Sequence, residues 1–364
     1  MRLDNNQQVF LELLKAGLWE KEARLLQFKD IDFKEIYKLA QEQCVVGLVA
    51  AGLEHVVDMK PPKEVLLKFI GLTLQLEERN RAMNSFIGVL VDKMRKAGIY
   101  TLLVKGQGIA QCYERPLWRA SGDVDLLLSE EDYIKARDYL VPLSSFQKKE
   151  GRYSKHLGLS IFEPLSEQEA TVPAKSWYVE LHGKLRTGLA ARVDELVDAV
   201  QKEEPYSGNV RTWKNGEYTV FLPAPDNDVI FVFTHFLKHF YREDITIRQI
   251  CDWSRLLWTC RDKVNVGLLE SRIKKAGLMK EWKAFAALAV DYLGMPVDAM
   301  PLYDERFKGK GSRLIDFILK GYSGNKVKDT WEIAKIFPCK TFRYLPSIFL
   351  NVNWLKIKER LLSK

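Results

Sequence analysis

The chain lacks the cysteine pattern of a disulfide-rich or zinc-binding fold. Its cysteines are odd in number, scattered, and never spaced C-x-x-C: they are Cys44, Cys112, Cys251, Cys260 and Cys339. Either framework needs paired or closely spaced cysteines. Nothing near Cys112 clearly activates its thiol, so we expect a small, buried, apolar side chain there.

Long apolar runs are missing as well. No segment reaches about 18 apolar residues without a charge, and the first residues, MRLDNNQQVFLELLKAG, are acidic and polar. A membrane span needs such a run, and a signal peptide needs a basic region followed by an apolar one. We therefore expect no membrane span and no signal peptide, and we predict a cytoplasmic protein.

Two familiar catalytic motif sets are also absent. The chain has no G-x-G-x-x-G loop, no H-R-D and no D-F-G, which argues against a protein-kinase-like fold. It has no H-E-x-x-H either, because Phe236 follows His235 in the pair formed by His235 and His239. Histidines at this spacing share a helical face and bind zinc only with a third ligand.

The composition is that of an ordinary globular protein, with 47% hydrophobic and 29% charged residues. A length of 364 residues favours two or three domains. The net charge of +8 lies at the C-terminal end, where residues 301–364 hold 14 Lys or Arg against 6 Asp or Glu. This excess is either a solvated helical face or a surface for an anionic partner, with nucleic acid as one candidate.

Helical periodicity covers both ends of the chain and strand-like alternation covers its centre. Residues 5–54 and 63–97 have apolar residues at spacings of three and four, with Asp30 or Asp32 as an N-cap, and helical spacing returns after Leu222. We predict an α+β protein. Its regions are an N-terminal helical region (1–97), a core with a small mixed sheet (98–222) and a C-terminal helical domain with a basic end (223–364).

Shorter patterns divide the central region further. Residues 148–163 predict one or two hairpin strands, and residues 164–173 predict a polar loop. An Asn215-Gly216 turn lies between apolar runs, which is a strong hairpin signal. Ser129 precedes three acidic residues and is expected to cap a helix.

Two carboxylates stand at the start of one predicted strand. Residues 99–104 predict a first strand, 107–113 a short helix and 124–128 a second strand that opens with Asp123 and Asp125. Alternate residues of a strand share a face about 6.5–7 Å apart. Two such carboxylates are costly to bury unless a cation lies between them, and Mg²⁺ is the natural occupant. The alternative is a turn residue followed by an edge-strand charge, because D-x-D is common.

Three segments together resemble a known family. LLVKG, then RASGDVDLLL, then VELH are similar to the uncharacterised bacterial nucleotidyltransferases, a branch of the superfamily related to DNA polymerase beta. The resemblance is sharp over residues 100–128 and weaker at 177–182 and 223–257. It implies a nucleotidyltransferase-like core that moves a nucleoside monophosphate from a nucleoside triphosphate, such as ATP, to an acceptor by a two-magnesium mechanism.

The resemblance also implies site residues. Asp123 and Asp125 would bind two Mg²⁺ ions, with Mn²⁺ as a substitute, and Glu180 on the alternating strand SWYVELHGKLR would be the third carboxylate, as a ligand or a base. An ordinary exposed glutamate is the alternative. Nucleotide binding is assigned to residues around these carboxylates: Lys105, Gly106, Gln107, Gly108, Arg119 and His182.

Three roles stay open at this point. Arg119 either meets a phosphate, braces Asp123 or is simply solvated, and His182 contacts substrate or is structural. The resembling family has a histidine and an Arg-x-x-x-Asp at the positions of His235, Arg248 and Asp252. Because Arg248 and Asp252 lie four residues apart, we expect a salt bridge between them.

One difference between this chain and the superfamily bears on catalytic activity. The superfamily usually has Ser or Gly after the turn glycine, whereas Gln107 follows Gly106 here, and fifteen residues separate Gln107 from Asp123. The phosphate-binding hydroxyl is therefore missing, and Lys105 would compensate as a point charge. The alternative function is an inactive nucleotidyltransferase-like protein that binds nucleotide, RNA or a protein partner. The acceptor stays open.

Overall fold

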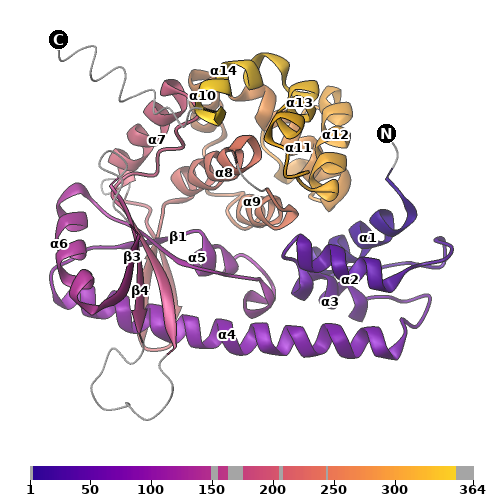
Figure 1. Ribbon diagram of the computed structural model, residues 1–364, viewed down its shortest axis with the longest axis horizontal. Coiled ribbons are helices and arrows are strands. Elements are labelled where there is room, and N and C mark those ends of the chain that lie inside the picture. The colour runs from indigo at the N-terminus through magenta and orange to yellow at the C-terminus, as the bar shows by residue number, and fades with distance from the viewer. Residues whose placement is uncertain (1–2, 149–154, 163–174, 205–207, 243–244, 350–364) are drawn as a thin grey trace.

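The computed structural model describes residues 3–148, 155–162, 175–204, 208–242 and 245–349, and it confirms the α+β class (Figure 1). Four helices precede the sheet: α1 (Asn5–Trp19), α2 (Phe33–Glu42), α3 (Val46–Glu54) and α4 (Lys63–Lys96). The Asp32 side chain caps α2 by accepting from the backbone N–H groups of Lys34 and Glu35. Helix α4 runs below both the sheet and the other N-terminal helices.

The sheet has five strands in the order β1-β2-β5-β4-β3. They are β1 (Leu102–Val104), β2 (Val124–Leu127), β3 (Ser144–Lys148), β4 (His156–Phe162) and β5 (Ser176–His182). Strands β2 and β5 pair in parallel, and the other neighbours pair antiparallel. The sheet is therefore mixed, as predicted, and the strand with Glu180 lies directly beside the strand with Asp125.

Three helices and a hairpin connect the sheet to the rest of the chain. They are α5 (Gly106–Ala110), α6 (Glu130–Leu140), α7 (Ala191–Glu203) and the hairpin of β6 (Arg211–Asn215) and β7 (Tyr218–Leu222). The hairpin confirms the prediction from Asn215-Gly216, and the Ser129 hydroxyl caps α6 as expected. The first strand and the short helix are shorter than predicted, and the predicted loop 164–173 lies outside the described residues.

Within the described residues, seven α-helices and two short 3₁₀ helices follow the hairpin. The α-helices are α8 (Pro225–Arg242), α9 (Ile247–Thr259), α10 (Val266–Ala276), α11 (Met279–Leu293), α12 (Lys308–Lys320), α13 (Lys326–Ile336) and α14 (Pro338–Phe349). They gather on the side of the molecule opposite α4, with α8 and α9 nearest to α5 (Figure 1). Among the described helices, none combines the length and the apolar character that crossing a bilayer requires.

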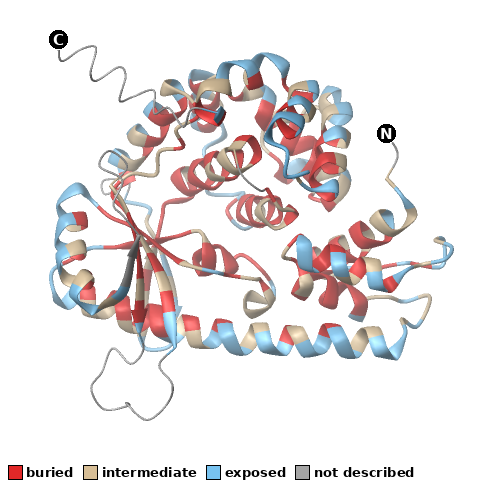
Figure 2. Ribbon diagram, in the orientation of Figure 1, coloured by how far each residue is buried: buried red, intermediate tan, exposed pale blue. Residues whose placement is uncertain are grey.

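The sheet has one apolar face and one polar face near the centre of β2 and β5. Val124 and Leu126 of β2 and Val179 of β5 belong to an apolar cluster with Phe86 and Leu90 of α4. Figure 2 shows the buried stretch of α4 under the sheet. Because strand side chains alternate, the intervening polar residues point to the opposite face. That face is turned toward α8 and α9.

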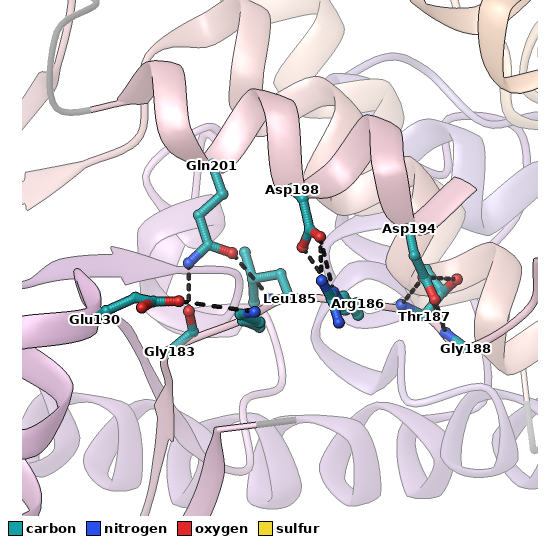
Figure 3. A network of polar contacts seen from close by, with 10 residues as sticks. Glu130, Gly183, Leu185, Arg186, Thr187, Gly188, Asp194, Asp198 and Gln201 are labelled. Atoms are coloured by element: carbon teal, nitrogen blue, oxygen red, sulfur yellow. Dashed lines mark hydrogen bonds and ion pairs between the residues drawn. The ribbon is translucent and has the colours of Figure 1, made fainter. Parts of the chain in front are cut away.

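A polar network fixes the end of β5 (Figure 3). Gln201 of α7 donates to the carbonyl of Gly183 at 2.6 Å and accepts from the backbone N–H of Leu185 at 3.1 Å. The Arg186 guanidinium donates to Asp198 at 2.8 and 2.9 Å. Since these residues directly follow β5, α7 holds the strand in the position from which Glu180 and His182 project.

Candidate functional site

Strand register brings the predicted carboxylates together. Asp125 is opposite Glu180 in the parallel β2–β5 pair, and Asp123 directly precedes β2. One carboxylate oxygen from each of these residues lies within 4.8 Å of the others. Three carboxylates and no other donor form an oxygen set of the kind that Mg²⁺ and Mn²⁺ prefer. The donor chemistry therefore fits the predicted metal.

Like charge is concentrated at this cluster. Burial, and then repulsion from Asp125, raises the pKa of Asp123 above its ordinary value. For Asp125 burial acts in the same direction, but the Lys105 charge and the His182 contact outweigh it and lower the pKa. Asp125 is therefore held as a buried carboxylate, and Asp123 is the member that gains most from a bound cation.

Two partners, Lys105 and His182, contact the same oxygen of Asp125. Lys105 Nζ donates to Asp125 Oδ1 at 2.7 Å, and His182 Nε2 lies 2.6 Å from the same oxygen. Lys105 sits at the turn between β1 and α5 with φ +57°, followed by Gly106 with φ +39°. A non-glycine residue at positive φ is strained, and such strain is concentrated at functional turns.

The other two residues of the predicted phosphate turn face away from the carboxylates. The Gln107 side chain is buried, and its Nε2 donates to Asn80 Oδ1 of α4 at 2.8 Å. A Cβ on Gly108 would lie 3.0 Å from Leu222 Cδ2 and 3.2 Å from the Leu103 carbonyl oxygen. Both residues thus pack α5 against its neighbours.

Arg119 is buried, which excludes the solvated arginine among the three alternatives for this residue. Its Nε and Nη2 donate to the two oxygens of Asp252 in α9 at 3.0 and 2.6 Å. Burial alone would lower the pKa of Arg119, but the Asp252 charge more than offsets this and raises it. Tyr113 also donates to Asp252, at 2.7 Å.

The expected salt bridge between Arg248 and Asp252 is therefore replaced by another arrangement. Asp252 is occupied by Arg119, and Arg248 Nη1 donates to the backbone carbonyl of Ala120 at 2.9 Å. Residues four apart on a helix can pair, but a buried bidentate partner from another element gives stronger hydrogen bonds. Both contacts fasten α9 to the loop that leads into Asp123.

The carboxylates line a cavity of about 320 Å³ between the sheet and the C-terminal helices. Of the predicted site residues, Lys105, Gly106, Arg119, Asp123, Asp125 and Glu180 line it, whereas Gln107, Gly108 and His182 do not. Its opposite wall comes from α8 and α9 and carries basic and imidazole groups: His235, Lys238, His239 and Arg248. The cavity thus has an acidic floor, and its opposite wall carries the cations Lys238 and Arg248.

The wall contains one histidine that stays neutral. Burial, and then the positive charge of Lys105, lowers the pKa of His235 well below its ordinary value. Among the described residues, neither His235 nor His239 belongs to a group that could hold a metal ion. The zinc interpretation of this pair therefore lacks its third ligand.

A larger cavity of about 1320 Å³ lies beside β6, α7 and α10. Arg211, Trp213 and Arg272 line it, and it contains none of the predicted site residues. Size alone does not identify a site, because binding requires convergent polar groups. The smaller cavity is the candidate, since the three carboxylates converge there.

Sequence reasoning missed two parts of this site. His156 of β4 is opposite His182 of β5, and their rings stack with centroids 4.7 Å apart. Lys238 of α8 joins the cavity wall. Strand alternation over residues 156–162 could have placed His156 on the polar face, but only the strand order reveals its neighbour.

The chain matches one family model, and the match agrees with the site. The model describes an uncharacterised nucleotidyltransferase and covers residues 29–294, which is most of the chain. The class is therefore that of a transferase acting with nucleotides. The chain belongs to the family of uncharacterised nucleotidyltransferases. Comparisons with curated proteins and with solved structures find no match.

Proposed function

We propose that the protein transfers a nucleoside monophosphate from a nucleoside triphosphate to an acceptor, with release of pyrophosphate. One observation carries this proposal: Asp123, Asp125 and Glu180 converge on the floor of a cavity whose opposite wall carries the cations Lys238 and Arg248. Family membership and the sequence resemblance to bacterial members of the DNA polymerase beta superfamily support it.

Asp123, Asp125 and Glu180 would hold two Mg²⁺ ions, or Mn²⁺ in their place. When bound, these ions would supply positive charge for the entering and leaving oxygens of the reaction. Asp125 contributes a carboxylate that is ionised before any metal arrives, because Lys105 and His182 already contact it. Glu180 would either share a metal ion or accept the proton of the acceptor hydroxyl.

The cations of the cavity would bind the triphosphate. Lys105 is the point charge nearest to the carboxylates, and Lys238 and Arg248 of the C-terminal helices would complete the binding of phosphate oxygens. On this proposal the core at 98–222 supplies the carboxylates, and the C-terminal domain at 223–364 supplies the basic wall.

The other predicted nucleotide-binding residues would act through the backbone or through a neighbour. Gly106 lets the turn pass close to the Asp123 carbonyl, with a would-be Cβ 3.3 Å from that oxygen. Gln107 and Gly108 would support the turn by packing α5. Arg119 would position the loop before Asp123 through its pair with Asp252, and His182 would orient Asp125.

A second candidate function is nucleotide binding without transfer. The Gln107 side chain replaces the usual hydroxyl and is bonded to Asn80, and two groups already contact Asp125 in the structure. Both observations favour a protein that binds nucleotide, RNA or a protein partner. Binding of a triphosphate without pyrophosphate release would identify this alternative.

The test is calorimetric titration of each nucleoside triphosphate into the protein, with and without Mg²⁺, using wild type, Asp123→Asn and Asp138→Asn. Asp138 is an exposed aspartate of α6 and serves as the matched control. We expect Mg²⁺-dependent binding that Asp123→Asn loses and Asp138→Asn retains. Equal binding by wild type and Asp123→Asn would refute the metal-nucleotide site.

A further inference from the structure

A second cluster of metal-type ligands lies beside the carboxylates. His156 of β4 is opposite His182 of β5, and Glu180 precedes His182 by two residues on the same face. One donor atom from each of these three residues lies within 4.8 Å of the others. The set contains two imidazole nitrogens and one carboxylate oxygen, unlike the all-oxygen set of Asp123, Asp125 and Glu180.

The spacing of the donors suits a tetrahedral ion. His156 Nε2 lies 3.0 Å and His182 Nε2 lies 3.5 Å from the same oxygen, Glu180 Oε2. A tetrahedral ion with bonds of about 2.0–2.1 Å separates its ligand atoms by roughly 3.3–3.4 Å. The two distances bracket this value. The two imidazole rings stack with centroids 4.7 Å apart, so one ring has to rotate before both nitrogens point at one ion.

His156 adds an independent observation. Its Nε2 atom is buried and has no hydrogen-bond partner among the described residues, although Glu180 Oε2 is 3.0 Å away. The distance is that of a hydrogen bond, but the angles are not. A buried polar atom without a partner calls for a ligand.

We propose that His156, Glu180 and His182 bind one transition-metal ion of the Zn²⁺ class, at a site that shares Glu180 with the carboxylate cluster. Imidazole ligands favour zinc and similar ions over Mg²⁺, which prefers oxygen. His156 and Glu180 line the cavity, so the ion is reached from it and keeps an open coordination position there. This inference does not rest on nucleotidyl transfer.

Asp125 competes with the ion in this site. It lies 2.6 Å from His182 Nε2, the nitrogen that the ion needs, so this contact has to open when the ion binds. Lys105 Nζ also donates to Asp125, at 2.7 Å, and balances its charge. When the ion binds, Asp125 therefore keeps the Lys105 charge, and Glu180 contacts the ion.

The test uses the full chain and two probes, Zn²⁺ by calorimetry and Co²⁺ by visible absorption. The test variant is His156→Gln. The matched control is His55→Gln, because His55 contacts Glu20 at a separate site. We expect His156→Gln to weaken binding of both ions at least about tenfold. His55→Gln should bind them like wild type, and circular dichroism checks folding.

Two further measurements keep the outcome decisive. Wild-type protein with Co²⁺ should show the intense absorption of a tetrahedral ion with nitrogen ligands, which needs no variant. Asp123→Asn should keep this absorption even where it loses nucleotide binding, which separates this site from the proposed function. Unchanged binding in His156→Gln, only weak octahedral absorption, or loss of Co²⁺ binding in Asp123→Asn would each overturn the proposal.

Discussion

Asp252 and Asp125 are both buried aspartates, but their surroundings differ in the balance of charge. Asp252 faces one guanidinium, Arg119, through two hydrogen bonds, and a phenol hydroxyl completes its shell. Asp125 faces Lys105 and His182 but shares its site with two further carboxylates, Asp123 and Glu180. A buried carboxylate that is neutralised by a cation holds elements of the fold together. A cluster with more carboxylates than cations instead forms a site for a further cation.

The Arg119–Asp252 ion pair also positions the carboxylate cluster. Arg119 lies four residues before Asp123, and Asp252 belongs to α9, so their pair fixes the loop that carries Asp123 against the C-terminal helices. Asn80 of α4 binds the same loop by donating to the Arg119 carbonyl at 2.9 Å. A buried ion pair adds little net stability but a great deal of positional definition. Removing either partner therefore costs much more than the pair contributes.

The largest expected effect follows from removing Asp125. Asp125→Ala should weaken Mg²⁺-dependent nucleotide binding by roughly 10²–10³-fold. The reason is that the proposed metal ions, which contribute several kcal/mol of charge stabilisation, lose a ligand. It should also lower the free energy of unfolding by about 3–5 kcal/mol, since Lys105 and His182 lose their buried partner. Calorimetry and denaturant unfolding measure the two effects.

Asp123 should behave differently from Asp125, because burial and the like charge of Asp125 disfavour its ionised form. Asp123→Asn should therefore lose nucleotide binding at no cost in stability. A variant Asp125→Ala that unfolds at the wild-type denaturant midpoint would show that its two contacts are dispensable.

The second effect concerns stability alone. Arg119→Met should lower the free energy of unfolding by about 3–5 kcal/mol, because Asp252 stays buried without its cation. Arg81→Met, which breaks an exposed pair with Glu77, should change it by less than about 1 kcal/mol. Urea unfolding of both variants measures the difference.

A double variant sharpens this comparison. Arg119→Met with Asp252→Leu replaces both charges by apolar groups and should recover much of the lost stability. Nucleotide binding should stay weakened in the double variant, because the loop before Asp123 has lost its fastening. Full recovery of binding together with stability would contradict a positioning role for Arg119.

The third effect is local to the turn beside the cluster. Gly106→Ala should lower stability by about 1–3 kcal/mol, because its φ of +39° is strained for alanine and its Cβ would lie 3.3 Å from the Asp123 carbonyl and Ser121 Oγ. Gly98→Ala is the matched control: φ is +72° there, but nothing lies within 4 Å of the added Cβ. Only Gly106→Ala should weaken nucleotide binding. Equal weakening by both would mean that backbone strain, not contact with Asp123, is responsible.

Local patterns predicted much of the fold and the strand faces of the carboxylates, whereas the family resemblance implied that Glu180 joins Asp123 and Asp125. Alternation in SWYVELH and the D-x-D spacing place Glu180 and Asp125 on strand faces, and a parallel β2–β5 pair then makes them neighbours. Ser129 and the Asn215-Gly216 turn act within a few residues, so the sequence shows them directly. These signals are short-range, and short-range signals can be read from one sequence.

The remaining parts of the site depend on contacts between distant residues. Arg119 and Asp252 are 133 positions apart, and Gln107 and Asn80 are 27 apart. Nothing in the residues beside Arg119 distinguishes a buried pair from a solvated arginine. His156 likewise gains its meaning only from the register that sets it opposite His182. Such contacts follow from tertiary packing, which no local pattern specifies.

The smallest expected effect concerns the thiol of Cys112, which lies beside a cation that is already paired with a carboxylate. Cys112 Sγ lies 4.0 Å from Arg211 Nη1, whose charge lowers the thiol pKa, but Arg211 is already paired with Asp228 and burial outweighs its effect. Burial raises the pKa of Cys112 to about 11, which leaves roughly one thiolate in a thousand at pH 8. Iodoacetamide should therefore label the exposed Cys339 and spare Cys112, as mass spectrometry of tryptic peptides can show. Unfolding in urea should make both react alike. Equal labelling in the folded protein would mean that the Arg211 charge is available to stabilise a thiolate, and that a buried cation with a matched partner can still activate its neighbour.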